Sequence, residues 1–168
     1  MSLTYEKITE KLSSKFGSDI YQIEEPYQML TVTVNRDKIL DIVRFLKEDP
    51  ELRFIFLTDL TGVHFPDDPT GDKLGAVYHL HNLVDNVRMR IKAFFPKESP
   101  YIDSLTPLYS GANWMERETY DFFGIIFNNH PNLKRILNVD DMDYHPMRKE
   151  YALEDPTRED KDDKFFGR

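Results

Sequence analysis

The chain has no cysteine among its 168 residues. Disulfide bonds, thiolate nucleophiles, zinc sites with thiolate ligands and cysteine-ligated iron–sulfur clusters are therefore excluded. Any redox role would need a cofactor held without cysteine, or a cofactor held by a partner. The absence of cysteine also favours a reducing compartment, the cytoplasm.

Long apolar runs and an excess of basic residues are missing as well. No apolar run approaches the ~20 residues that a helix needs to cross a bilayer. The first twelve residues alternate charged and apolar side chains and lack the apolar core of a signal peptide. The net charge is −8, whereas a nucleic-acid-binding protein usually carries a basic surface. We therefore expect neither a transmembrane segment nor a nucleic-acid partner.

The sequence contains none of the common catalytic motifs. There is no P-loop, no G-x-G-x-x-G, no G-x-S-x-G and no H-E-x-x-H. An enzyme acting alone would have to work without any of these sites. This argues against autonomous catalysis.

Apolar residues make up 40% of the chain and aromatic residues 13%. This content is enough for a hydrophobic core, so the chain as a whole is expected to fold. Its length favours one domain with an appended segment. We expect an α+β domain in residues 1–125 and an extended C-terminal arm in residues 126–168, with an acidic tail from about residue 154.

The hydrophobic pattern predicts a two-layer sandwich in which helices cover one face of a mixed sheet of about five strands. The predicted element order is α-β-β-α-β-β-β. One helix ends at Gly17, and another lies between Asn35, which can cap it, and Pro50. Strands are predicted at residues 20–23, 29–34, 54–57, 76–82 and 87–94. The strand 54–57 is expected to be central, and residues 62–75 are expected to form a loop.

Short helices follow the last predicted strand. Ser99-Pro100 can begin one, with serine as the cap. A second is predicted over residues 112–123, where Asn113 and Glu116 resemble a capping box and Gly124 suits the end of the helix.

Two further groups of residues could form sites on predicted strands. His79 and His81 lie on one face of a strand, but a metal site needs at least a third ligand. Asp59 and His64 are possible third ligands that no spacing singles out, so we favour a structural role. Residues 88–92 form a basic stripe, which is either a solvated face or a contact with a partner protein.

The segment 116–137 contains the densest mixture of charged and aromatic residues. Glu116, Glu118 and Asp121 could be read as acid–base carboxylates, but on a helix the first two point about 200° apart. Arg117 and Asp121 are four residues apart and can pair. We therefore expect a helix with locally paired charges, or a protein interface, in preference to a catalytic site.

Two His-Pro pairs and an apolar run complete this region. In His130-Pro131 and His145-Pro146, the proline favours an extended histidine, so both pairs are expected to be turns. The run of five apolar groups is too long for one helix face, so we expect some to pack on the domain and some on a partner. These residues are Phe122, Phe123, Ile125, Ile126 and Phe127.

The same region resembles the signature of the 30-kilodalton subunit of respiratory complex I, which is the C subunit of bacterial NADH–quinone oxidoreductase. The resemblance is carried by Glu116-Arg117-Glu118, Asp121-Phe122-Phe123-Gly124, His130-Pro131 and Arg135-Ile136-Leu137. Asn113-Trp114 and the run His145-Pro146-Met147-Arg148-Lys149-Glu150-Tyr151 also fit. The likeness thus covers residues 111–151. It departs from the family at Tyr144, where glycine is frequent. The end at Arg168 corresponds to the short form, without fusion to the 49-kilodalton subunit.

The resemblance implies a non-catalytic scaffold subunit of the peripheral arm, on the cytoplasmic face of the bacterial inner membrane. Such a subunit braces the quinone-reducing module and contacts the 49-kilodalton subunit (the D subunit) and its neighbours. NADH, flavin, iron–sulfur clusters and quinone are then expected on partner subunits, with no cofactor and no metal in this chain. The residues that the resemblance assigns to the signature and partner interface are Glu116, Arg117, Glu118, Asp121, Phe122, Phe123, Gly124, His130, Pro131, Arg135, His145, Pro146, Arg148 and Lys149.

Three alternatives remain at this point. An equivalent subunit occurs in membrane-bound hydrogenases and in ferredoxin- or deazaflavin-linked dehydrogenases, where the electron donor binds elsewhere. A free-standing hydrolase would use Glu116 or Glu118 with a histidine. A metal-binding module would be built on His79 and His81.

Overall fold

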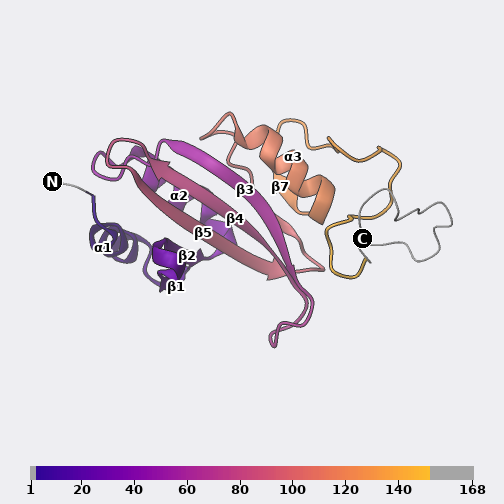
Figure 1. Cartoon of the computed structure of the whole chain (residues 1–168), viewed down its shortest axis with the longest axis horizontal. Coiled ribbons are helices and arrows are strands. Elements are labelled where there is room, and N and C mark those ends of the chain that lie inside the picture. Colours follow the sequence, from indigo (N-terminus) through magenta and orange to yellow (C-terminus); the bar gives the residue numbers. More distant parts are fainter. Residues whose placement is uncertain (1–2, 152–168) are drawn as a thin grey trace, which may run out of the picture.

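The computed structural model describes residues 3–151 of the chain. A five-stranded sheet with the order β1-β2-β5-β4-β3 forms its centre, and a separate two-stranded sheet joins β6 to β7 (Figure 1). The helices are α1 (Tyr5–Phe16), α2 (Ile39–Glu48) and α3 (Ala112–Phe123), with 3-10 turns η1 (Gly17–Asp19), η2 (Pro26–Gln28) and η3 (Arg36–Lys38). The strands are β1 (Ile20–Glu24), β2 (Leu30–Val34), β3 (Phe56–Phe65), β4 (Lys73–Asn82), β5 (Val87–Pro96), β6 (Tyr101–Asp103) and β7 (Ile126–Asn128).

The central sheet is mixed, as predicted. β2 pairs with β5 in parallel, while β1–β2, β3–β4 and β4–β5 are antiparallel. Alternate residues of each strand point to one face, where Val32, Tyr78 and Ile91 meet Leu12 of α1 and Leu46 of α2 in one apolar cluster. We call this the core face, and the opposite side the open face. Figure 1 shows α2 behind the sheet. The predicted α+β sandwich with helices on one face is confirmed.

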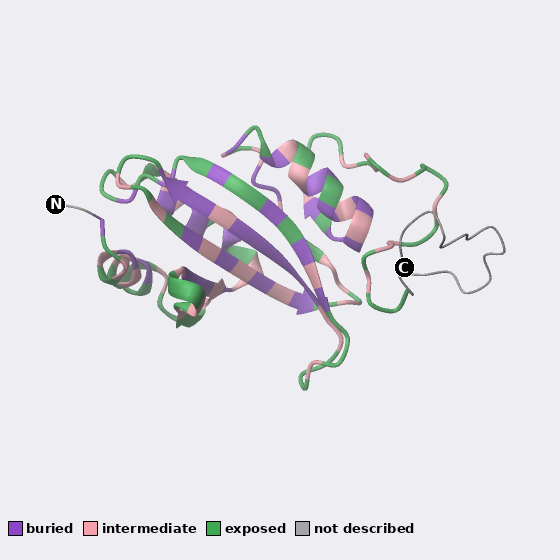
Figure 2. Ribbon diagram, viewed as in Figure 1, coloured by how far each residue is buried: buried purple, intermediate pink, exposed green. Residues whose placement is uncertain are grey.

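β3 differs from its predicted form. The expected central strand at residues 54–57 is wrong, because β3 runs over Phe56–Phe65 and lies at the edge of the sheet. The expected loop 62–75 is accordingly shorter, since both of its ends continue the β3–β4 hairpin. Gly62 sits inside the strand because Phe123 packs on it, and a Cβ there would lie 2.5 Å from the ring. Figure 2 shows the alternation of buried and exposed residues along β3.

The predicted short helix at Ser99-Pro100 is also wrong. The chain instead forms β6, which pairs in parallel with β7 and buries Ile102 and Phe127. Residues 126–128, the start of the predicted arm, are thus held against the domain. The division at residue 125 into a domain and an arm over partner subunits stays a prediction, and the acidic tail from about residue 154 lies outside the described residues.

Within residues 3–151, none of the helices combines the length and the hydropathy needed to cross a membrane.

Candidate functional site

The signature residues come together around α3 and the segment that follows it. The helix has the predicted bounds, 112–123, and Gly124 ends it in the left-handed conformation with φ 73°. A Cβ at Gly124 would lie 2.5 Å from both His145 Cδ2 and Arg148 Nη2. Glycine is therefore required here both by the backbone and by the close approach of residues 145–148.

Residues 145–148 cap the carboxyl end of α3. Helix ends leave several carbonyl groups without partners inside the helix. His145 Nδ1 donates to Asp121 O at 3.0 Å, Met147 N donates to Phe122 O at 3.0 Å, and Arg148 Nε donates to Phe123 O at 2.7 Å. The guanidinium of Arg148 also lies where the helix dipole favours a cation. The second His-Pro motif therefore fixes the helix end, and Pro146 lies in the turn between these contacts.

The Asp121 carboxylate organises the segment 135–138. It accepts hydrogen bonds from the backbone N–H groups of Ile136, Leu137 and Asn138 at 3.1, 2.9 and 2.9 Å. It also accepts from Asn138 Nδ2 at 3.0 Å and from Arg135 Nη1 at 2.7 Å. Burial opposes ionisation, but these donors outweigh it and hold the pKa of Asp121 well below its usual value. The carboxylate is thus a fully occupied structural anchor.

The two arginines of the signature reinforce this anchor. Arg135 Nη2 donates to the carbonyls of Met142 and Tyr144 at 2.6 and 2.9 Å. One guanidinium therefore connects Asp121 on the helix to both of these carbonyls. Arg117 donates to the carbonyls of Lys134 and Arg135, both at 3.2 Å, and lies 5.0 Å from the Trp114 ring. The expected pair between Arg117 and Asp121 is wrong, because each finds its partners on the following segment instead.

Glu116 is enclosed beneath the helix. Its carboxylate accepts from Leu105 N and Ser104 Oγ, both at 2.6 Å, and burial raises its pKa to about 7. The expected capping box with Asn113 is therefore wrong, and the N-cap is Gly111, which makes no side-chain hydrogen bond. Glu118 is exposed on another side of the helix. The predicted separation of the two glutamates is confirmed.

His130 joins the following loop to the start of α3. Its Nε2 donates to Asn113 O at 3.1 Å, and its Nδ1 accepts from Asn132 N at 3.0 Å. Burial lowers the pKa of His130, which favours the neutral ring that this pattern requires. The nearest carboxylate oxygen, on Glu116, is 4.0 Å away. Pro131 is exposed in the turn, so the first His-Pro pair has the predicted turn role.

The two histidines considered as possible metal ligands, His79 and His81, make contacts within the chain, in line with the structural role that the sequence favoured. His79 Nε2 accepts from Arg90 Nε at 2.9 Å, and His81 Nε2 lies 3.0 Å from Asn86 Oδ1. Within residues 3–151, a different group of possible metal ligands lies together, formed by His64, Asp72 and Glu150. The ammonium group of Lys97 already pairs with both acids of that group. His64 also accepts the backbone N–H of Lys149 at 2.8 Å, so it fastens the end of the signature to the sheet.

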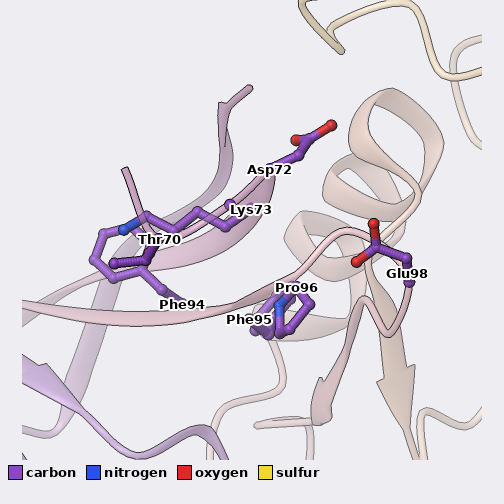
Figure 3. A pocket seen from close by; sticks show the side chains of 8 residues that line it. Thr70, Asp72, Lys73, Phe94, Phe95, Pro96 and Glu98 are labelled. Atoms are coloured by element: carbon purple, nitrogen blue, oxygen red, sulfur yellow. The ribbon is translucent and has the colours of Figure 1, made fainter. Parts of the chain in front are cut away.

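Two hollows on the surface of the described residues are lined by neither Glu116 nor Asp121. One of about 340 Å³ lies at the ends of β4 and β5, where Figure 3 shows Lys73 beside Phe94 and Asp72 pointing away from them. Another, of about 280 Å³, lies between β3 and α3 and includes Asp59 and Glu118. The contacts of the two buried carboxylates, Glu116 and Asp121, hold α3 against the segments before and after it.

The apolar run at residues 122–127 contains both buried and exposed positions, and contact of the exposed ones with a partner stays a prediction. Phe123, Ile125 and Phe127 are buried, Phe122 is partly buried and Ile126 is 46% exposed. Beyond the run, the segment that Asp121 and Arg135 anchor presents further large apolar side chains to solvent. These exposed residues are Leu137, Val139, Tyr144, Met147 and Tyr151.

Comparison with known proteins gives the family. Residues 32–157 match the family model described as the 30 Kd subunit of respiratory-chain NADH dehydrogenase. The chain belongs to this family. It is 41% identical over 154 residues to the C subunit of the NADH-quinone oxidoreductase of Mycolicibacterium gilvum (strain PYR-GCK). The aligned region covers 89% of this chain and 68% of the relative.

Two further members of the family support the assignment. The C subunit of the NADH-quinone oxidoreductase of Geobacter sulfurreducens (strain ATCC 51573 / DSM 12127 / PCA) is 42% identical over 151 residues, covering 89% of this chain and 90% of the relative. The solved trypsin-resistant fragment (1–134) of Nqo5 is 31% identical, with a TM-score of 0.65, and covers 76% of this chain and 98% of its own. The resemblance read from the signature is therefore confirmed, and so is the fold.

Sequence reasoning missed the partners of the signature side chains. Ser104 and Leu105, which bind Glu116, stood out in no motif, and neither did the buried Tyr78 near the same carboxylate. The hydroxyl of Tyr78 has no hydrogen-bond partner within the described part of the chain. The alternation of β4 could have marked Tyr78 as a core residue, but no spacing rule connects it to Glu116.

Proposed function

We propose that the chain is a non-catalytic scaffold subunit in the peripheral arm of a proton-translocating NADH–quinone oxidoreductase. It braces the quinone-reducing module while electrons pass from NADH to quinone. Its partners are the 49-kilodalton subunit (the D subunit) and neighbouring subunits, on the cytoplasmic face of the bacterial inner membrane. NADH, flavin, iron–sulfur clusters and quinone are held by those partners, and this chain holds no cofactor.

The observation that carries the proposal is the use of the signature charges. Asp121 binds the backbone of residues 136–138, Arg117 binds the carbonyls of residues 134 and 135, and Glu116 is enclosed. Each of these charged groups is bound by groups of the same chain, which supports a role in holding the shape of the segment. The names of the relatives, which are C subunits of NADH-quinone oxidoreductases, support the choice of complex.

The exposed apolar side chains of the same segment support a docking role. Leu137 and Val139 are 65% and 64% exposed, although the backbone beside them is fixed by Asp121. A fixed backbone that presents apolar groups loses less conformational entropy on binding than a free one. These observations support the proposal that the segment 134–151 is a pre-shaped surface for partner subunits.

The test is Arg117→Ala in the intact complex. Loss of two hydrogen bonds to the carbonyls of residues 134 and 135 should loosen the docking segment and reduce the amount of assembled complex in membranes. Turnover per assembled complex should stay near the wild-type value. Lys38→Ala is the matched control, because it removes an exposed positive charge from a residue outside the docking segment. Normal assembly of Arg117→Ala with lost turnover would mean that the scaffold proposal is wrong.

A further inference from the structure

The open face of the sheet carries a cluster of positive charge on an otherwise acidic chain. Arg88, Arg90 and Lys92 alternate along β5 with Met89 and Ile91, which are fully buried on the core face. Lys73 begins β4 on the same face. The net charge of the whole chain is −8. The basic stripe seen in the sequence is therefore a local exception to the charge of the molecule.

The four cations of this face are not equally neutralised. Lys92 Nζ lies 3.0 Å from a carboxylate oxygen of Glu24, and Lys73 Nζ lies 2.6 Å from one of Asp68. Between residues 3 and 151, no ion pair involves Arg88 or Arg90. We call these two residues the arginine pair. They lie two positions apart on one strand, so their side chains leave the sheet on the same side.

The orientation of Arg90 is fixed in advance. Its Nε–H donates to His79 Nε2 at 2.9 Å, so the remaining proton of a neutral His79 is on Nδ1, 3.7 Å from Asp59 Oδ2. Burial, followed by the charge of Arg90, lowers the pKa of His79 and keeps the ring neutral. The terminal nitrogens of Arg90 make no hydrogen bond within the described residues, while Arg88 is exposed.

We propose that the arginine pair binds carboxylate side chains on an acidic surface of a partner subunit, which covers the open face of the sheet. The proposal rests on the proposed function, since it requires a complex. An arginine presents a planar set of donors that matches a carboxylate, and an arginine held in place loses little entropy on binding. Complementary charge also directs the approach of the partner and fixes its register.

The occupant that the charges favour is a protein. An anionic membrane surface generally attracts clusters of about four to eight basic residues, whereas this face has two that are not neutralised. The net charge of −8 would also repel an anionic membrane or a nucleic acid at long range. A partner protein needs only a few carboxylates at positions that match the arginine pair.

The test is charge reversal in the full-length chain, with partner subunits recovered from native membranes at about 0.05 and 0.3 M salt. Arg88→Glu/Arg90→Glu should reduce recovery about tenfold at low salt. Arg88→Glu alone removes no side-chain hydrogen bond among the described residues and should give a smaller loss in the same direction. Lys38→Glu is the matched control, since Lys38 is exposed on a turn away from this face and should have wild-type recovery.

A second measurement identifies what covers the arginine pair. Phenylglyoxal modifies accessible arginines, and mass spectrometry reads each position. Arg88 should react in the isolated chain and be protected in the complex. Protection already in the isolated chain would assign the site to this chain itself and overturn the proposal. Charge-dependent sedimentation of the wild type with phosphatidylserine vesicles would assign it to lipid and also overturn it.

The two proposals fail in different ways. If the wild-type chain recovers oxidoreductase subunits and both reversal variants recover the same amount, the arginine pair is not an interface while the scaffold role stands. If the wild type recovers none of these subunits, both proposals are wrong.

Discussion

Replacing Glu116 with glutamine should remove a pH dependence from the stability of the domain. The carboxylate is fully buried and accepts from Leu105 N and Ser104 Oγ. Glutamine has the same shape, so its oxygen can accept from Leu105 and its amide can donate to Ser104. The substitution therefore removes the titration of this site and retains its packing.

The size of the effect follows from the pKa of Glu116, which burial raises from 4.5 to about 7. A raised pKa means that the folded state holds the proton more tightly than the unfolded state. The protonated Glu116 carboxyl therefore contributes its full stabilisation below pH 4.5, and this contribution falls as the pH rises and is lost above pH 7. A difference of about 2.5 pKa units corresponds to about 3 kcal/mol across this window. The free energy of unfolding of Glu116→Gln, taken as the difference from the wild type, should thus rise by about 3 kcal/mol as the pH is raised from 4.5 to 8.

The assay is urea unfolding of both purified chains at several pH values, read as the difference in free energy of unfolding. Other titrating groups are the same in the two proteins, so they cancel in the difference. A difference that does not change between pH 4.5 and pH 8 would show that the Glu116 carboxyl is not desolvated, and the enclosed position assigned to it would be wrong.

Two further substitutions test the anchor and the helix end. Asp121→Ala leaves three backbone N–H groups and Arg135 without their acceptor and should cost about 3–5 kcal/mol in urea unfolding, whereas Asp121→Asn, which keeps one oxygen, should cost clearly less. Equal costs for the two variants would contradict the anchor role. Gly124→Ala should cost at least about 2 kcal/mol in the same assay, because of its φ of 73° and the contact with His145. The control Gly111→Ala, with φ −65° and open space around the added Cβ, should be close to neutral. A similar effect at both glycines would refute the close approach.

Features that depend on neighbouring residues could be predicted from the sequence. The end of α3 follows from Gly124, whose left-handed conformation acts within one helical turn. The β4–β5 hairpin and the separation of Glu116 from Glu118 follow in the same way from strand and helix periodicity. Each of these predictions needs only geometry that the local chain determines.

Features that depend on distant partners could not be predicted. Glu116 binds groups that lie 11 and 12 residues before it, and Asp121 binds backbone that lies 15–17 residues after it. Local spacing rules assigned these side chains to a capping box and to an i, i+4 pair, because such rules cannot weigh burial against exposed pairing. The length of β3 was missed for a related reason, since Gly62 weakens a strand pattern unless the packing of Phe123 is known.

The central claim is that the segment 134–151 is a docking surface and that this chain carries no chemistry of its own. The most direct measurement is recovery of partner subunits from native membranes with Leu137→Asp, compared with Asn132→Asp, which also adds a negative charge at an exposed position but lies outside the docking segment. The account predicts that Leu137→Asp unfolds at the wild-type urea concentration, because its side chain is 65% exposed, yet recovers about tenfold less of the partners. Asn132→Asp should recover wild-type amounts. Wild-type recovery with Leu137→Asp, accompanied by lost quinone reduction, would contradict the account.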